Sequence, residues 1–225
     1  MRKNRLILIL IVVSVIFPFI SYLLNFYADW LFFAETGFSS VFTTTLFAKA
    51  GSWLLFGGLL FIFVQINMQY AARAQFPLSG IYIVEGGNFR IHRDDAARLV
   101  KPVSMLITAG LALLAGNWGA MQWEDLLIFT NKMAVGTADP VIGKDIGFYL
   151  FSLPFLERLK GFASFMLLAT TGMGAAVYYF RGGLTLTDRG AAVDHKVRRH
   201  LAVLVGIFAC VVAAGFYLDS FKLMF

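Results

Sequence analysis

Cysteine, histidine and charged residues are scarce in this chain of 225 residues. Its one cysteine, Cys210, excludes an intrachain disulfide and a cysteine-based metal site. The three histidines, His92, His195 and His200, fall outside the long apolar runs, which gives no support to a haem held by two histidines within a helical bundle. Charged residues make up 14% of the chain, whereas a soluble domain has about 25%. This shortage disfavours a soluble globular protein.

Recognisable catalytic motifs are missing as well. The stretch VEGGNF, residues 84–89, is a Gly-Gly turn without the lysine and the helix context that a phosphate-binding loop requires. No stretch matches the Ser-x-x-Lys or Gly-x-Ser-x-Gly patterns of serine nucleophiles. Basic residues flank His195 and His200, which favours a basic surface over a metal site. We therefore expect no enzymatic activity, no catalytic residue, no metal and no cofactor.

Apolar residues are abundant instead, at 59% of the chain with a mean hydropathy of +0.75. A bilayer core of about 30 Å needs about 20 helical residues. Five apolar runs come close to or exceed this length, namely residues 6–26, 42–66, 103–121, 162–180 and 201–218. Only helices and closed barrels satisfy backbone groups in lipid, and barrel strands would alternate. The sequence therefore predicts an all-α, polytopic membrane bundle of about five helices, forming one domain over residues 1–225.

The first run follows the positively charged start MRKNR. A cleaved signal peptide has an apolar core of about 7–15 residues and a small-residue cleavage site. The run over residues 6–26 is longer, and no such site follows it. We expect a retained first span that also directs insertion.

Lysine and arginine are distributed unequally between the segments that connect the runs. Residues 1–5, 67–102 and 181–200 carry thirteen of them, and the alternate segments carry five. Acidic residues show the opposite distribution, with eight on the lysine-poor side and five on the other. Because cytoplasmic loops carry the excess of Lys and Arg, five spans place the N-terminus in the cytoplasm and the C-terminus outside. Residues 67–102 and 181–200 are then cytoplasmic loops.

The net charge of +6 raises the question of an anionic partner. Basic residues beside the predicted spans suit anionic lipid headgroups, worth about 1 kcal/mol per residue near the surface. This interpretation is favoured over nucleic-acid binding. The candidate lipid contacts are Arg181, Lys196, Arg198 and Arg199.

The outer segment over residues 117–161 breaks the apolar pattern. Its first part predicts a short amphipathic helix on the outer surface, with Trp118 and Trp123 in the aromatic belt. Pro140 then ends helical geometry, Gly143 and Gly147 permit tight turns, and Pro154 suits the first turn of the next helix. We interpret this segment mainly as a device that leads the chain back into the membrane, with a binding site there as the alternative.

Two features within the runs are candidates for a functional role. Lys49 is the one ionisable residue inside a run, where snorkelling or a position at the membrane edge is favoured over ion movement. Small residues also recur every four positions, which lets membrane helices approach closely. They are Ala202, Gly206, Cys210 and Ala214; Gly172 and Ala176; and Ala112, Gly116 and Ala120. Packing within the chain is the first expectation, and docking of a partner is the alternative.

Four stretches of the chain are informative together, namely DPVIGKDIGFYLFSLPF, DWLFFAETGFSSVF, RGGLTL and HLAVLVGIFACVVAAGFYLDSFKLMF. They resemble the signature segments of uncharacterised protein family 0182, a group of bacterial multispanning membrane proteins, and taken from the N-terminus they occur in the right order. The resemblance covers most of the chain and implies the N-terminal membrane portion of longer proteins in the bacterial cytoplasmic (inner) membrane. Two alternatives stay open: a fragment of such a protein, or a shortened member that serves as a subunit. The resemblance supplies no catalytic residue.

Two functions are compatible with these observations. We expect a non-enzymatic accessory subunit or membrane anchor that assembles with other membrane proteins. The alternative is a component of a transporter or channel for lipid or another small molecule, although the spans offer few polar residues for a path, chiefly Lys49, Gln65 and Asn67. A pocket lined by Lys49 would favour transport, and a small-residue stripe that faces outward would favour assembly.

Overall fold

The computed structural model describes residues 2–74, 76, 84–86, 89–91, 93–187 and 190–224. Within these ranges the side chains of 2–15, 18, 84–86, 89–91, 93–97, 185–187, 190–191 and 223–224 are not described. The chain divides into two compact units, Met1–Ala48 and Lys49–Phe225. The boundary between them falls inside the second helix, so each unit is treated by itself.

The first unit consists of helix α1 (Arg2–Glu35) and the beginning of helix α2 (Ser39–Arg73). Gly37 joins the two helices with a φ of 77°, a left-handed conformation that suits glycine. The ring of Phe42 lies 5.5 Å from that of Phe26 and 5.8 Å from that of Phe33, measured between centroids. The tight turn and these ring contacts hold the two segments together.

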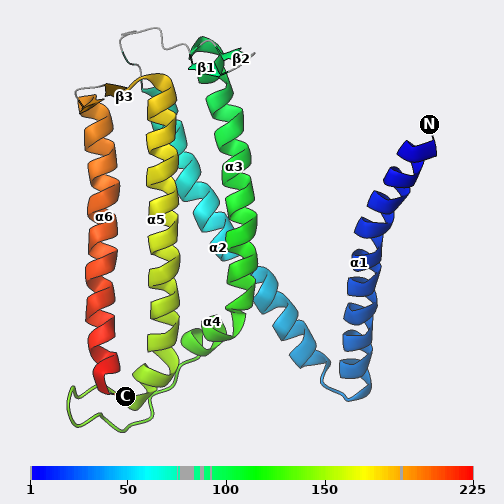
Figure 1. The fold of residues 1–225 in the computed structure, drawn as a ribbon. Coiled ribbons are helices and arrows are strands. Elements are labelled where there is room, and N and C mark those ends of the chain that lie inside the picture. Colours follow the sequence, from blue (N-terminus) through cyan, green and yellow to red (C-terminus); the bar gives the residue numbers. More distant parts are fainter. Residues whose placement is uncertain are drawn as a thin grey trace. The chain divides into compact units, whose positions relative to one another are not determined.

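The second unit is a bundle of long helices with short elements at both ends (Figure 1). After α2 come α3 (Arg93–Met121), α5 (Leu153–Arg181) and α6 (His195–Ser220). One end carries the antiparallel hairpins β1–β2 (Val84–Gly86 and Phe89–Ile91) and β3–β4 (Leu184–Thr187 and Gly190–Val193). The other end carries α4 (Trp123–Thr130), the π-helical turn η1 (Phe148–Ser152) and the 3₁₀ turn η2 (Phe221–Met224).

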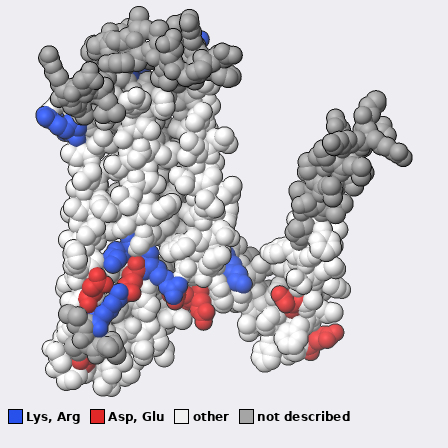
Figure 2. Space-filling model, viewed as in Figure 1, with Lys and Arg blue, Asp and Glu red and all other residues white. Residues whose placement is uncertain are grey.

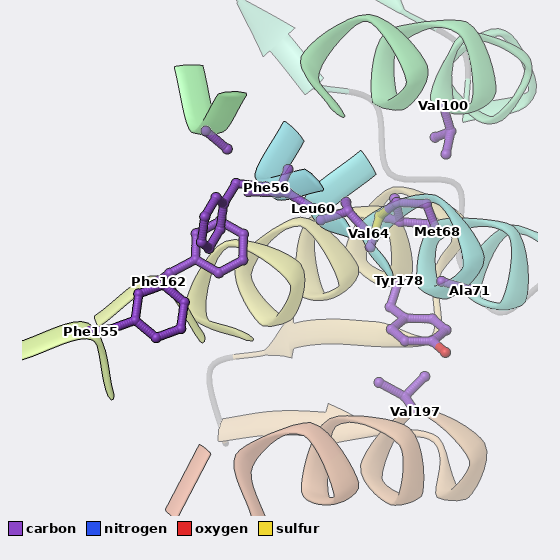
Figure 3. Close-up of a cluster of buried hydrophobic side chains, with 12 residues drawn as sticks. Phe56, Leu60, Val64, Met68, Ala71, Val100, Phe155, Phe162, Tyr178 and Val197 are labelled. Atoms are coloured by element: carbon purple, nitrogen blue, oxygen red, sulfur yellow. The ribbon is translucent and has the colours of Figure 1, made fainter. Parts of the chain in front are cut away.

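The core of this bundle is built from apolar side chains of α2, α3, α5 and α6 (Figure 3). Helix α2 contributes a row with a spacing of four residues, which places the row on one helical face. The row consists of Phe56, Leu60, Val64 and Met68. Phe162 of α5 meets Phe56 edge-on at 4.9 Å between centroids, and Trp118 of α3 stacks on Phe162 at 5.6 Å. The half-buried ring of Trp118 packs against Phe56 and Phe162, and its predicted place in the aromatic belt stays a prediction.

Helices α2 and α3 approach closely through glycines. A Cβ atom added to Gly57 would lie 2.9 Å from the backbone oxygen of Ala112, and one added to Gly116 would lie 2.8 Å from the ring of Trp53. In lipid, small residues of this kind allow helices to gain van der Waals contact. The small residues of α3 therefore pack inside the chain.

Four helical segments of the described chain are long and apolar enough to cross a membrane. They are Ser39–Arg73, Arg98–Met121, Phe148–Arg181 and His195–Ser220, and each contains one of the predicted runs. The all-α membrane bundle is thereby confirmed. The first predicted span, residues 6–26, lies in α1, but most of its side chains are outside the described set, so it stays a prediction. The orientation in the membrane and the division into one domain stay predictions too.

Candidate functional site

A hydrogen-bonded polar cluster joins three helices near the end that carries the hairpins. His200 of α6 lies between Asn67 of α2 and Tyr178 of α5. Its Nε2 is 2.9 Å from Asn67 Oδ1, and its Nδ1 is 2.8 Å from the Tyr178 hydroxyl oxygen. Tyr178 is fully buried. Polar bonds of this type between membrane helices each contribute about 0.6 kcal/mol.

The direction of the hydrogen bonds follows from the chemistry of the three side chains. Asn67 Nδ2 donates to the backbone oxygen of Phe63 at 2.7 Å, which turns the amide oxygen toward His200. That oxygen only accepts, so Nε2 of His200 carries a proton, and Nδ1 of the neutral imidazole accepts from Tyr178. Sequence analysis assigned His200 to a basic surface together with His195. The structure separates them: His195 is exposed, while His200 points into the bundle.

The Gly-Gly pair after α5 has a separate physical cause for each glycine. Gly182 ends the helix with a left-handed φ of 79°, and its amide bonds to the last carbonyls of α5. A Cβ atom on Gly183 would lie 2.5 Å from the ring of Phe76. The segment RGGLTL thus combines a helix cap with a close contact.

The four candidate lipid contacts occupy different environments. Arg181 is half-buried and donates from Nε and Nη2 to the backbone oxygen of Ala74, at 3.3 and 3.1 Å. Ala74 directly follows α2, and its carbonyl has no hydrogen-bond donor within that helix. Arg181 therefore supplies a donor at the end of α2. Lys196, Arg198 and Arg199 are exposed in the first turns of α6. Asp194 caps this helix by accepting from the Lys196 amide at 2.8 Å.

Two aspartates order the charged turn before α5. Asp145 accepts hydrogen bonds from the amides of Val135, Gly136 and Gly147 at 3.0, 2.8 and 2.6 Å. Asp139 accepts from the amides of Val141 and Ile142 at 3.3 and 2.9 Å. The Tyr149 hydroxyl also donates to Asp139, at 3.1 Å. Both carboxylates are used to hold the backbone, which supports the interpretation of this segment as a structural device.

These contacts shift the titration of both carboxyls. Amide donors, first that of Val135 and then those of Gly136 and Gly147, lower the pKa of Asp145 below its usual 3.8. Desolvation raises the pKa of Asp139, but hydrogen bonds from Ile142, Val141 and Tyr149 outweigh it, so the net shift is also downward. Both groups are therefore ionised at neutral pH, as backbone anchors require.

The predicted roles of the glycines and Pro154 in this segment can be compared with the structure. Gly143 has the positive φ, 72°, that a tight turn requires. Gly147 is right-handed, and a Cβ atom there would lie 2.7 Å from the backbone oxygen of Met133. Gly147 thus serves a close approach and not a left-handed turn. Pro154 lies in the first turn of α5, as predicted.

Ion pairs connect α4, α5 and the segment after α6 at the same end. Arg158 bonds Asp125, with 2.9 Å between Nη1 and Oδ2, and also donates to Gln122. Lys222 lies 2.8 Å from Glu157 and 3.1 Å from Asp219. Figure 2 shows a group of charged side chains in the lower part of the second unit and a broad surface without Lys, Arg, Asp or Glu above it, which is the distribution expected at a membrane boundary. The sequence does not predict these ion pairs, because their members are far apart in the chain.

Lys49 belongs to this end of the second unit. Its side chain is exposed, and Nζ lies 5.6 Å from the ring centroid of Trp123. A cation over an indole face is attracted by the ring electrons. The arrangement agrees with a position at the membrane edge.

The small-residue stripes of α5 and α6 face outward. Ala202, Gly206, Cys210 and Ala214 are all exposed, as are Gly172 and Ala176. A Cβ atom added to Gly206 or to Gly172 would meet nothing within 4 Å. Within the second unit, Gly206 and Gly172 therefore have no neighbour at their Cα positions, in contrast to Gly116 of α3.

The four apolar helices and the uncharged band define the chain as a helical membrane protein. The chain belongs to the Uncharacterised protein family (UPF0182), which matches residues 6–225. This match confirms the resemblance that the four sequence stretches indicated.

Similar proteins cover the whole chain at high identity. A UPF0182 protein of Pelobacter propionicus is 67% identical over 225 residues, and one of Geobacter sp. strain M21 is 66% identical over 224. A more distant UPF0182 protein of Streptomyces coelicolor is 34% identical and matches 99% of the chain. The chain spans about a quarter of the length of these relatives: 25% of the first two and 22% of the third. No solved structure matches the chain.

Proposed function

We propose that the chain is a non-enzymatic membrane scaffold of the bacterial cytoplasmic membrane, which assembles with a further transmembrane helix through α6. The observation that carries the proposal is the outward stripe of Ala202, Gly206, Cys210 and Ala214. Membrane helices associate through such stripes because their backbones can approach closely. The partner is a helix of another subunit or of a longer chain of the same family.

The coverage of the helices supports this choice. Of the most apolar 18-residue stretch of α6, only 11% is buried inside the structure, compared with 33% for the corresponding stretch of the segment that contains α5. The inward side of α6 is already engaged through His200 and the buried Val197 and Leu204. The outward side is thus the part of α6 that is free to receive a partner in the described structure.

Transport is the less favoured function. Lys49, the residue that would favour it, lies over Trp123, and it does not line the pocket between α2 and α3. The buried Tyr178 and the half-buried Asn67 both bond the half-buried His200, and these bonds support the packing of the helices.

A photocrosslinking residue at Ala214 tests the proposal directly. The gene is altered at its own locus, cells are irradiated, and crosslinked peptides are identified by mass spectrometry after gentle purification. We expect crosslinks to a defined protein helix, and their loss in a Gly206→Leu variant. Val205, an exposed residue off the stripe, provides the matched position, at which we expect lipid crosslinks.

Lipid crosslinks alone at both positions would overturn the assembly function. Recovery of the chain with a defined small molecule and no protein partner would raise transport above it. A Val205→Phe variant controls for added bulk, since it should leave the Ala214 crosslinks unchanged.

A further inference from the structure

A pocket of about 350 Å³ lies between α2 and α3, at the end where α2 finishes and α3 begins. Each helix lines it with residues about one turn apart, which share a helical face. From α2 these are Gln65, Met68, Gln69, Ala72 and Arg73, and from α3 they are Lys101, Pro102, Ser104 and Met105. The pocket is separate from the α6 stripe and from the His200 cluster.

Two cations stand at the rim of the pocket. Arg73 is in the last turn of α2, and Lys101 precedes Pro102 in α3. Both side chains are exposed, and neither has an ion pair among the described residues. Arg181 offers a contrast, because the Ala74 carbonyl already occupies its guanidinium group. The rim therefore holds positive charge without a protein counterion in the described part of the chain.

The interior of the pocket has both an apolar wall and a polar acceptor. Met68 and Ala72 are buried, and Met105 contributes a long apolar side chain. Gln65 Oε1 is buried without a hydrogen-bond partner among the described residues. A buried acceptor without a donor is unfavourable, so this oxygen is suited to a hydroxyl group supplied by a ligand.

The pocket also lies at the level expected for lipid headgroups. The helical segments that are apolar enough to cross a membrane end at Arg73 in α2 and begin at Arg98 in α3. A ligand there has its charged group beside water and its chains beside the apolar helix surfaces. Arginine binds phosphate with two parallel hydrogen bonds, and lysine adds a compact positive charge.

We propose that this pocket binds an anionic phospholipid whose headgroup carries a free hydroxyl group. Arg73 and Lys101 hold the phosphodiester, and the hydroxyl group donates to Gln65 Oε1. The site is distinct from the exposed basic residues at the start of α6, which do not line this pocket. The proposal does not rest on a partner helix.

Native mass spectrometry of the purified chain with added lipid tests this site. We expect the wild type to retain one phosphatidylglycerol at least tenfold more strongly than phosphatidylcholine. The double variant Arg73→Ala/Lys101→Ala should lose this preference. The control Arg198→Ala/Arg199→Ala removes the same charge from exposed positions and should keep it. If both double variants lost the preference for phosphatidylglycerol equally, the preference would depend only on the net charge of the chain, and the proposal would be overturned.

Two further measurements test the role of Gln65 and the source of the phosphate group that binds. Gln65→Leu retains both cations, and should abolish the preference for phosphatidylglycerol over phosphatidylethanol, which has no free headgroup hydroxyl. An unchanged preference would contradict the role of Gln65. Millimolar glycerol 3-phosphate or inorganic phosphate should not displace the lipid. Displacement by either would assign the pocket to a free anion.

Discussion

Helices α3 and α6 both carry small residues at four-residue intervals, yet they use them differently. Gly116 of α3 is covered by the Trp53 ring, and the neighbouring Gly57 of α2 lies against the α3 backbone. Gly206 of α6 meets nothing within 4 Å. The overall burial of the two helices agrees with this difference: 28% of the most apolar stretch of α3 is buried, compared with 11% for α6. A stripe of small residues therefore marks a possible close approach, and the surrounding helices determine whether it is used inside the chain.

The largest difference between the two regions should appear when a methyl group is added to each. Gly57→Ala places its Cβ 2.9 Å from a backbone oxygen, which cannot rotate away, and we expect a loss of about 1–3 kcal/mol in unfolding free energy. Gly206→Ala meets open space, and we expect a gain of up to about 1 kcal/mol from helix propensity. Thermal unfolding of both variants in detergent measures this. Equal stability of the two variants would refute the comparison.

A smaller effect should distinguish the two sides of α6 itself. His200→Leu removes the partner of both Tyr178 and Asn67 on the inward side, and we expect a loss of about 1–2 kcal/mol. Cys210→Ala on the outward side should change the stability by less than about 0.5 kcal/mol. Urea or thermal unfolding in the same detergent provides the measurement. A cost for Cys210→Ala as large as that for His200→Leu would show that the outward side is packed.

The smallest effect concerns acid, to which neither small-residue stripe should respond. The pKa of Asp145 is lowered by amide donors, so its contribution to the ordering of the turn is complete above about pH 4 and is lost as the pH falls through the folded-state pKa. Amide NMR signals of Val135, Gly136 and Gly147 should titrate with a midpoint below 3.8, while that of Gly206 should not. Asp145→Asn should abolish the titration. A midpoint above 3.8 would contradict the hydrogen bonds.

The sequence identified the helices well, because a run of about twenty apolar residues has few alternatives in lipid. Each of the four long apolar helical segments contains one predicted run and extends beyond it. It also placed Pro154 in a first helical turn and marked the Asp139–Phe155 stretch as structural. The two hairpins were not predicted, since strands of three and four residues leave little periodicity.

Contacts between distant segments could not be predicted in the same way. Asn67 and His200 are 133 positions apart, and nothing in either local pattern indicates the other. The ion pairs of Arg158 and Lys222 and the pocket between α2 and α3 are of the same kind. Each depends on the rotation of the helices about their own axes. The sequence does not predict this rotation, because a membrane helix that is apolar on every face shows no single face to be buried.

By itself the sequence determined the class of protein, the helices and the family, since these depend on local composition and on long shared motifs. The tertiary structure decided which small residues are buried, which histidine points inward and which basic residues are free. The physical reason is that burial in lipid requires only apolar side chains, whereas contact between helices requires complementary shapes and hydrogen bonds across the chain.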